Sequence, residues 1–530
     1  MSRPKAQLSP NAIAITSPFY VRRFYLLITF CVVICYARTA GFSFLPTDDT
    51  WLIALKLDKL RDIRNLPGLF SESTYDVFYR PVLHLSYMLD AQLPADTAKA
   101  MHISNIVYHL LVCFALFHFL RLIGMKNEIA AILCFVFAVH PMNVQAVAWI
   151  SGRNDSLLAL FLLLSCNMLL SYFRSKDYGQ LLLHLLFFSL ALFTKETAIV
   201  IPVLYILLLA FFTPLWKKPT FAFFLPAWII LCSARIYLQI RIAQHSTEPI
   251  GISENVLEFF NGAIMQLGKV LLPVGQSAYP IAEYTLLFPY IAAIAAFAFL
   301  LLKFRFHEKK IAIVGFAWFI VLMILPTWFG ASTSPAVHYE HRAYAALPGI
   351  LLVISQVKLP WQKFRLRAAI PALIFLLLLL SLRRESVYEN SSSYVTSCVN
   401  DAPSVSLFQD LAGLDHQTNK RNDQAIICFN NAIGIDTTHA EYYNHRGVSW
   451  LNLKQYKPAI ADFTKADQLH PYQRETSYNL SLSYYYVKDF ASAERYFEEA
   501  DSLGAYIDPA YATALEKAMK DQAQSGLASE

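Results

Sequence analysis

The stretch HPMNVQAVAWISGRND occupies residues 140–155, between two apolar runs that each approach the length of a membrane-spanning helix. Pro141 and Gly152 are helix-breaking residues, so a chain that is helical on both sides is expected to turn here. The turn also gathers many polar side chains, which an apolar protein rarely places at one membrane edge. The stretch therefore predicts two membrane helices joined by a short turn, and it favours a functional site over simple capping of the helix ends.

The composition extends this interpretation to most of the chain. Of the 530 residues, 56% are hydrophobic and 15% are charged, whereas soluble domains carry about 25% charged residues. The net charge is +6, but no basic run is interleaved with aromatic residues, so we expect no nucleic-acid partner. The sequence predicts an all-α, multi-pass membrane bundle with about eleven apolar spans, at roughly 24–38, 102–120, 128–146, 156–172, 180–194, 197–213, 220–240, 284–303, 311–328, 344–357 and 368–382.

Lysine and arginine residues are distributed unevenly between the predicted connections. When residues 1–23 are placed in the cytoplasm, basic clusters fall in the inner connections, and the short outer connections contain only Arg153, Lys195 and Arg342. The bias of basic residues towards the cytoplasmic side therefore predicts a cytoplasmic N-terminus. This topology depends on a hairpin at residues 194–197, because a single helix over 180–213 would invert every later span.

After residue 383 the composition becomes polar and aromatic, and a repeat appears. Gly413, Gly447 and Ser481 follow one another at intervals of 34 residues, the tetratricopeptide period, and alanine and phenylalanine positions recur with them. Small residues let the two helices of a unit pack closely, while phenylalanine fills the groove between units. We therefore predict a transmembrane domain over 24–382, an extracytoplasmic linker over 383–405, three tetratricopeptide repeats over 406–518 and a disordered tail over 519–530.

The first outer loop, residues 39–101, is long and mixes apolar with charged residues around Trp51. This mixture is typical of an amphipathic helix that lies in the membrane interface. Asp48 and Asp49 precede it and have two interpretations: they cap the helix, or one of them is a general base that accepts a proton from a hydroxyl. Arg80, before Pro81, could hold a phosphate or carboxylate through two hydrogen bonds, or it could simply extend to the interface.

Two further polar stretches are predicted on the outer face. TKET (194–197) contributes Lys195 and Glu196, which either pair with each other or leave Lys195 to contact a phosphate. VHYEHRAYAALPG (337–349) contributes Glu340, His341 and Arg342. The spacing of His338 and His341 could serve a metal ion, but third and fourth ligands are not evident, so the sequence indicates no metal site.

Together these stretches resemble the transmembrane and tetratricopeptide repeat O-mannosyltransferases and their bacterial relatives, within the GT-C superfamily of polyprenyl-phosphate-sugar-dependent glycosyltransferases. The resemblance covers most of the chain from about 24 to 507. It rests on the Asp-Asp pair after the first span, YRP (79–81), residues 140–155, TKE (194–196), HRAYAALPG (341–349) and the repeats. The stretch EHRAY departs from the Glu-Arg-Tyr-like pattern of relatives, so either Glu340 or His341 takes the acidic position.

The resemblance implies an integral-membrane, GT-C-like glycosyltransferase that moves a sugar, such as mannose, from a polyprenyl-phosphate donor to a hydroxyl acceptor with inversion. The implied acceptor is protein serine or threonine, held by the repeats on the extracytoplasmic side. No cofactor is required, because arginine and lysine neutralise the phosphate. Asp48 is the first choice of base and Asp49 the second. The candidate contacts to the donor phosphate or the rest of the substrate are Arg80, His140, Arg153, Asp155, Lys195, Glu196, Glu340, His341 and Arg342.

The sequence leaves the compartment and one alternative function open. A bacterial inner membrane is favoured over the endoplasmic reticulum, because the repeat array is short. The alternative function is a non-enzymatic, membrane-anchored tetratricopeptide scaffold for envelope proteins, in which the polar cluster would be structural. Transport is disfavoured, because the charged residues lie at one membrane edge and not near its mid-plane.

Overall fold

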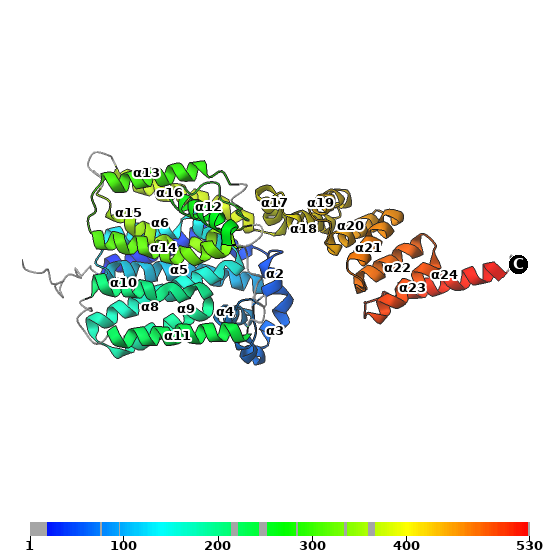
Figure 1. Cartoon of the computed structure of the whole chain (residues 1–530), viewed down its shortest axis with the longest axis horizontal. Helices are drawn as coiled ribbons and strands as arrows, with labels where there is room; N and C mark the ends of the chain where they lie inside the picture. The colour runs from blue at the N-terminus through cyan, green and yellow to red at the C-terminus, as the bar shows by residue number, and fades with distance from the viewer. Residues whose placement is uncertain are drawn as a thin grey trace, which may run out of the picture. The chain divides into compact units, whose positions relative to one another are not determined.

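The computed structural model describes residues 18–74, 77–94, 96–213, 221–242, 252–281, 285–332, 336–358 and 366–527. Its regular structure is helical, and the pairing of extended segments within these ranges is limited to three isolated bridges. The predicted all-α class is therefore confirmed. The chain divides into two compact units, Met1–Tyr394 and Val395–Glu530, both drawn in Figure 1.

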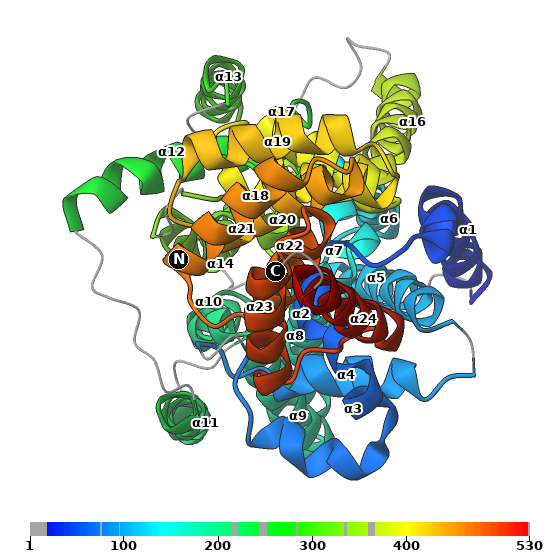
Figure 2. The same ribbon diagram turned by 90° about the vertical axis from the view of Figure 1, so that its right-hand side faces the viewer.

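The first unit is a bundle of long helices with short helices gathered at one end (Figure 1). Viewed from that end, α1, α11, α13 and α16 lie at the periphery of the bundle (Figure 2). The α-helices of this unit and of the segment that leaves it are α1 (Pro18–Tyr36), α2 (Asp48–Leu52), α3 (Leu57–Arg61), α4 (Pro81–Ala91), α5 (Thr97–Leu122), α6 (Asn127–Ala138), α7 (Val144–Ala148), α8 (Arg153–Ser175), α9 (Tyr178–Thr194), α10 (Ile201–Phe212), α11 (Phe221–Ile242), α12 (Ile252–Leu271), α13 (Phe288–Lys303), α14 (Lys309–Ala331), α15 (Leu347–Gln356), α16 (Leu366–Glu385) and α17 (Ser391–Asp401).

The prediction of eleven spans is wrong, although each predicted range contains helix. Among the described residues, five helices are long and apolar enough to cross a membrane: Val21–Gly41, Thr97–Leu122, Ile150–Ser175, Phe224–Ile242 and Lys309–Ala331. A sixth would be the pair Asn127–Ala138 and Pro141–Ala148, which is bent by 53°. Four other ranges form apolar helices of only 10–17 residues, whereas a bilayer core requires about 20. The five helices still indicate a multi-pass membrane protein.

The predicted hairpin at residues 194–197 is present. Helix α9 ends at Thr194, and the 3-10 helix η6 (Glu196–Val200) begins two residues later and continues into α10. The rings of His184 and Tyr205 lie 4.8 Å apart between centroids, so the two helices return alongside each other. This turn presents Lys195 and Glu196 at the end of the bundle.

Helices α14 and α15 approach each other through two glycines. A Cβ atom on Gly349 would lie 2.5 Å from the carbonyl oxygen of Gly315, and one on Gly315 would lie 2.6 Å from the carbonyl oxygen of Gly349. Glycine thus allows the two backbones to touch, as small residues do where membrane helices pack. The crossing lies near the start of both helices, and the segment between them carries the 3-10 helix η9 (Glu340–Ala343).

The second unit consists of tetratricopeptide-like helix pairs, as the repeat predicted. The pairs are α18 (Ser406–Thr418) with α19 (Asn422–Ile435), α20 (Ala440–Asn452) with α21 (Tyr456–Leu469), and α22 (Arg474–Tyr486) with α23 (Phe490–Ser502), followed by α24 (Pro509–Leu527). Gly413 and Gly447 face the rings of Phe429 and Phe463, so each small residue receives the phenylalanine of its partner helix. At the third position, Ser481 Oγ donates a hydrogen bond to the carbonyl of Ala493 (2.7 Å).

The predicted ends of the repeat region contain further helix. The range 383–405 holds the end of α16 and all of α17, and the range 519–530 overlaps α24 as far as Leu527. Tyr511 and Leu515 of α24 are buried against the last helix pair. Helix α24 therefore covers the open side of the final repeat, as terminal helices of repeat arrays do.

We predict opposite effects for two glycine-to-alanine substitutions in the repeats. A Cβ on Gly447 would lie 2.6 Å from the buried ring of Phe463, whereas one on Gly434 would meet no atom within 4 Å. Gly447→Ala should destabilise α20 and α21 by about 1–3 kcal/mol through overpacking. Gly434→Ala should stabilise α19 by up to about 1 kcal/mol through helix propensity. Hydrogen–deuterium exchange of the full chain measures both, and slower exchange in Gly447→Ala would contradict the packing described.

Candidate active site

The two predicted carboxylates occupy different environments at the start of α2. Asp49 is completely buried. Its Oδ1 accepts hydrogen bonds from the backbone nitrogen (3.0 Å) and hydroxyl (2.5 Å) of Ser151, and its Oδ2 accepts one from the backbone nitrogen of Leu45 (3.2 Å). Asp48 is only partly buried. Asp49 therefore ties the first loop to the turn before α8, and Asp48 is the more accessible carboxylate.

Arg80 lies at the N-terminal end of α4 and forms a two-pronged ion pair with Glu196. Its Nε donates to Oε2 at 2.9 Å and its Nη2 to Oε1 at 2.7 Å. Burial alone would lower the pKa of Arg80. The negative charges of Glu196, Asp155 and Asp48 raise this pKa by a larger amount, so the guanidinium stays charged. Asp48 and Arg80 thus lie within electrostatic reach of each other.

Asp155 and Lys195 form a second ion pair in the same region. Asp155 stands in the first turn of α8, and its Oδ2 accepts a hydrogen bond from Lys195 Nζ at 2.6 Å. The Nε2 atom of His341, from η9, lies 3.7 Å from the same carboxylate oxygen. Three segments far apart in the sequence therefore meet around one carboxylate.

Arg342 completes this group from η9. Its Nη1 donates to the carbonyl oxygens of Pro326 (3.1 Å) and Val337 (3.0 Å), so it also closes the end of α14. Burial lowers the pKa of Arg342 below its ordinary value. The charge of Arg80 acts in the same direction, and the charges of Asp155 and Glu196 partly oppose it. We name the six residues Arg80, Asp155, Lys195, Glu196, His341 and Arg342 the charge cluster. With three cations and two carboxylates, and with His341 neutral, it carries a net charge of +1 when Asp48 is left out.

The structure places Arg153 away from this cluster, in the interior of the bundle. Its guanidinium pairs with Asp90 at 2.6 Å and donates to Asn105 Oδ1 at 2.6 Å and to the carbonyl of Met101 at 2.7 Å. The side chain is fully buried, and the ring of Tyr87 covers its face at 5.0 Å. Arg153 therefore holds α4, α5 and α8 together, and contact with a donor phosphate would require it to abandon these partners.

Two other predicted residues also bind the protein itself. His140 Nε2 donates to the carbonyl of Val270 (3.2 Å), and its Nδ1 accepts from the backbone of Met142 (3.3 Å). Glu340 Oε1 accepts from Lys269 Nζ (2.7 Å) and from the backbone nitrogen of Ser277 (2.8 Å). The structure therefore separates both residues from the charge cluster, although Glu340 adjoins His341 in sequence.

Sequence reasoning missed the residues that hold the cluster in place. Lys269, on α12, anchors Glu340, and both side chains are about 1% exposed. Arg235, on α11, donates to the carbonyl of Tyr79 (2.8 Å), directly before Arg80. Each cation stands in a largely apolar stretch. A charge at that depth is costly, so such a residue indicates a buried group with a partner.

An apolar cavity lies next to the segment that carries η9. It has a volume of about 360 Å³ and is lined by side chains of α12, α13, α14 and α15, such as Phe259, Phe297 and Met323. Gln266 lines it too, and its Nε2 donates to the carbonyls of His338 (2.8 Å) and Tyr339 (2.9 Å). The cavity therefore begins beside the residues that precede Glu340.

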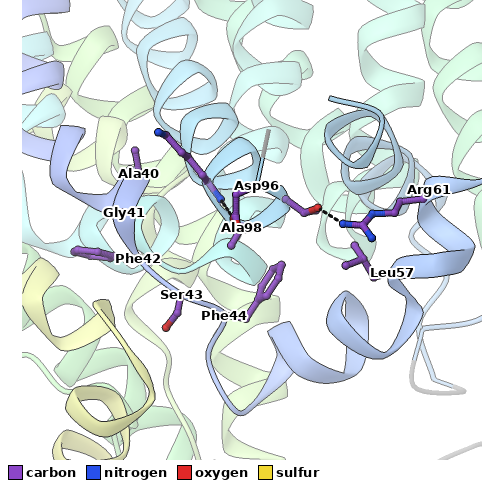
Figure 3. Close-up of a pocket in the computed structure, with 11 residues that line it drawn as sticks. Ala40, Gly41, Phe42, Ser43, Phe44, Leu57, Arg61, Asp96 and Ala98 are labelled. Carbon is purple, nitrogen blue, oxygen red and sulfur yellow. Dashed lines mark hydrogen bonds between the residues drawn. The ribbon is translucent and has the colours of Figure 1, made fainter. Parts of the chain in front are cut away.

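A second cavity, of about 550 Å³, contains none of the predicted site residues (Figure 3). It is lined by residues 40–44, by Leu57 and Arg61, and by the first turn of α5. Arg61 points to Thr97 and donates to its hydroxyl at 3.1 Å. Among the described residues, no group of three or more His, Cys, Asp or Glu side chains is placed to hold a metal ion.

Comparison with known proteins finds a distant, partial similarity to O-mannosyltransferases. Human protein O-mannosyl-transferase TMTC1 is 32% identical over 191 residues, which are 32% of this chain and 21% of that protein. Mouse protein O-mannosyl-transferase TMTC4 is 28% identical over 183 residues, which are 30% of this chain and 24% of that protein. The similarity thus spans about a fifth to a quarter of these relatives. No protein-family model matches the chain.

Solved structures resemble the helical repeats only loosely. The second TPR of Spaghetti (RPAP3), bound to the HSP90 peptide SRMEEVD, covers 18% of this chain and 91% of that chain at 19% identity and a TM-score of 0.18. The APC/C hetero-tetramer Cut9-Hcn1 covers 83% of this chain and 89% of that chain at 12% identity and a TM-score of 0.24. The repeats are therefore identified from the helix pairs of this chain and not from similarity to solved structures.

The buried Asp49 predicts a pH dependence of stability. Burial outweighs the hydrogen bonds from Ser151 and Leu45 and raises the pKa of Asp49 to about 7 from 3.8. The native state therefore binds a proton that the unfolded state releases, so the stability from this proton is present below about pH 4 and is lost as the pH rises through 7. In Asp49→Asn, the melting temperature should fall less than in the wild type between pH 6 and pH 8. If the melting temperatures of both proteins fell by the same amount between pH 6 and pH 8, this prediction would be contradicted.

Proposed function

We propose that this chain is an integral-membrane glycosyltransferase, GT-C-like, that transfers a sugar from a polyprenyl-phosphate donor to a hydroxyl acceptor at the extracytoplasmic face. The observation that carries the proposal is the charge cluster, in which Arg80, Lys195 and Arg342 come from separate parts of the bundle, and Arg80 also feels the charge of Asp48. The partial similarity to protein O-mannosyltransferases supports the same reaction class.

The charge balance of the cluster suits a phosphate leaving group. A polyprenyl-phosphate sugar is a phosphodiester with one negative charge, and a second charge develops on the phosphate as the bond to the sugar breaks. Cations fixed in position before the reaction stabilise such developing charge more than they stabilise the donor. The surplus positive charge of the cluster would therefore favour the transition state over the bound donor.

The remaining steps follow from the position of Asp48. The acceptor hydroxyl oxygen attacks the anomeric carbon, and the bond from that carbon to the phosphate oxygen breaks on the opposite face with inversion. Polyprenyl phosphate leaves with the bonding electron pair, and Asp48 takes the hydroxyl proton as general base. Asp49 is a poorer base for this step, since all its hydrogen bonds link the protein to itself.

The apolar cavity suits the polyprenyl tail of the donor. Its lining is almost entirely aliphatic and aromatic, and it begins beside His338 and Tyr339. A lipid chain that leaves this cavity along η9 would bring its phosphate towards Arg342 and Lys195. We propose, from the uneven distribution of basic residues alone, that this end of the bundle faces the extracytoplasmic side of a bacterial inner membrane.

The repeats would hold a protein acceptor. A cavity of about 480 Å³ in the second unit is lined by Asn444, Tyr478, Asn479 and Tyr506, among others. Asn479 Nδ2 donates to Asn444 Oδ1 at 3.3 Å, and such amides can pair with the backbone of an extended peptide. Concave helical-repeat surfaces provide room for chains of this kind.

Removal of the base tests the reaction directly. We predict that Asp48→Asn lowers sugar transfer from radiolabelled polyprenyl-phosphate mannose to serine- and threonine-rich peptides by about 10²- to 10⁴-fold, with donor binding retained. Asp58→Asn is the matched control, because Asp58 is an exposed carboxylate of the same loop, and it should leave transfer unchanged. A wild-type protein that neither transfers nor hydrolyses the donor would instead favour the scaffold.

The acceptor site is tested separately from the chemistry. We predict that Asn444→Ala with Asn479→Ala raises KM for the acceptor peptide about tenfold, as expected for the loss of one or two hydrogen bonds, and leaves KM for the donor unchanged. Asn452→Ala removes an exposed asparagine elsewhere in the repeats, which contacts Asn422, and serves as the control. Equal acceptor KM values in all three proteins would contradict peptide binding by this cavity.

A further inference from the structure

We propose that His341 Nε2 and Asp155 Oδ2 together recognise hydroxyl groups of the donor sugar, with His341 acting as a hydrogen-bond acceptor. This inference rests on the proposed function and assigns a specificity role to one side of the charge cluster. It begins from a short chain of hydrogen bonds that fixes which nitrogen of the imidazole carries the proton.

The amide of Gln145 determines the orientation of this chain. Its Nε2 lies 3.2 Å from the carbonyl oxygen of Ala278, and because that oxygen only accepts hydrogen bonds, the amide nitrogen must face it. Gln145 Oε1 then faces His341 and accepts from its backbone nitrogen at 3.0 Å. The same oxygen lies 3.1 Å from His341 Nδ1, so Nδ1 must carry a hydrogen.

The other ring nitrogen is therefore a lone-pair acceptor when the imidazole is neutral. Burial and the neighbouring charges of Lys195, Arg342 and Arg80 lower the pKa of His341 well below its usual value, which keeps it neutral near pH 7. Asp155 is the carboxylate facing it, but the distance of 3.7 Å from Nε2 to Oδ2 is too long for a hydrogen bond. The two atoms are thus neighbouring acceptors that do not hydrogen-bond to each other.

Such a pair selects a ligand that presents hydrogen-bond donors. A phosphate or carboxylate oxygen would be repelled by the two acceptors, and an added cation would be repelled by the net positive charge of the cluster. Neighbouring hydroxyls of a sugar fit both limits, because each is an uncharged donor. The rings of Trp149 and Tyr339, centred 5.4 Å and 5.2 Å from that of His341, supply the aromatic surroundings that sugar rings favour. Arg80, Lys195 and Arg342 would then hold the phosphate, while His341 and Asp155 hold the sugar.

The test measures discrimination between donors. Transfer to serine- and threonine-rich peptides is compared for polyprenyl-phosphate mannose and for deoxy analogues that each lack one sugar hydroxyl. For the wild type, we expect kcat/KM to fall about tenfold or more for at least one analogue, because a site built for a hydroxyl rejects a donor without it. In His341→Phe this preference should disappear, and His341→Gln, whose amide reaches the position of Nε2, should restore part of it.

Two further variants separate recognition from folding. Gln145→Met removes the oxygen that fixes the imidazole, and it should weaken the preference for the same hydroxyl. Gln266→Met removes the other buried amide that holds the same loop through the carbonyls of His338 and Tyr339, and it should change transfer from all donors by one common factor. The inference alone would be overturned if His341→Phe kept the preference unaltered. It would also be overturned if the wild type used every deoxy analogue with the same kcat/KM as the parent donor. No transfer from any donor by the wild type would overturn the proposed function and the inference with it.

Discussion

Charged side chains that leave water must find partners, because the cost of burying an isolated charge amounts to several kcal/mol even after the protein relaxes. In this protein the partners come from distant parts of the sequence. Lys195 meets Asp155, Arg80 meets Glu196, and Lys269 meets Glu340. Each pair joins the end of one helix to the end of another, so the geometry of the helix ends depends on these contacts.

The same requirement separates structural charges from those available to a ligand. Arg153 has Asp90, Asn105 and the carbonyl of Met101 as partners, and a phosphate would have to replace all of them. Breaking such a buried pair costs about 3–5 kcal/mol. In the charge cluster, by contrast, cations outnumber carboxylates, and Glu196 keeps about a fifth of its side-chain surface exposed. Under the proposed function, an incoming anion would add to the cluster without replacing partners as completely as it would at Arg153.

Hydropathy and spacing predicted the helical class, the hairpin and the repeats because these depend on local pattern. Lys195 and Glu196 could be found because a charged pair interrupts two apolar runs. The structural role of Arg153 could not be predicted, because GRND (152–155) and YRP (79–81) both place an arginine at the start of a helix. Only the three-dimensional neighbours distinguish these two arginines. The number of spans failed for a related reason: hydropathy does not reveal where a helix stops, as at the 53° bend between Ala138 and Pro141.

Helix η9 connects the buried Lys269–Glu340 pair to the charge cluster. Successive side chains of a 3-10 helix point about 120° apart, because it has three residues per turn. Glu340 enters the buried pair with Lys269, and His341 and Arg342 consequently face other directions, towards Asp155 and the end of α14. The Glu340 anchor therefore sets the rotation of η9 about its own axis. The Lys269–Glu340 pair therefore contributes, together with the contacts of Gln145 to His341, to the orientation of η9.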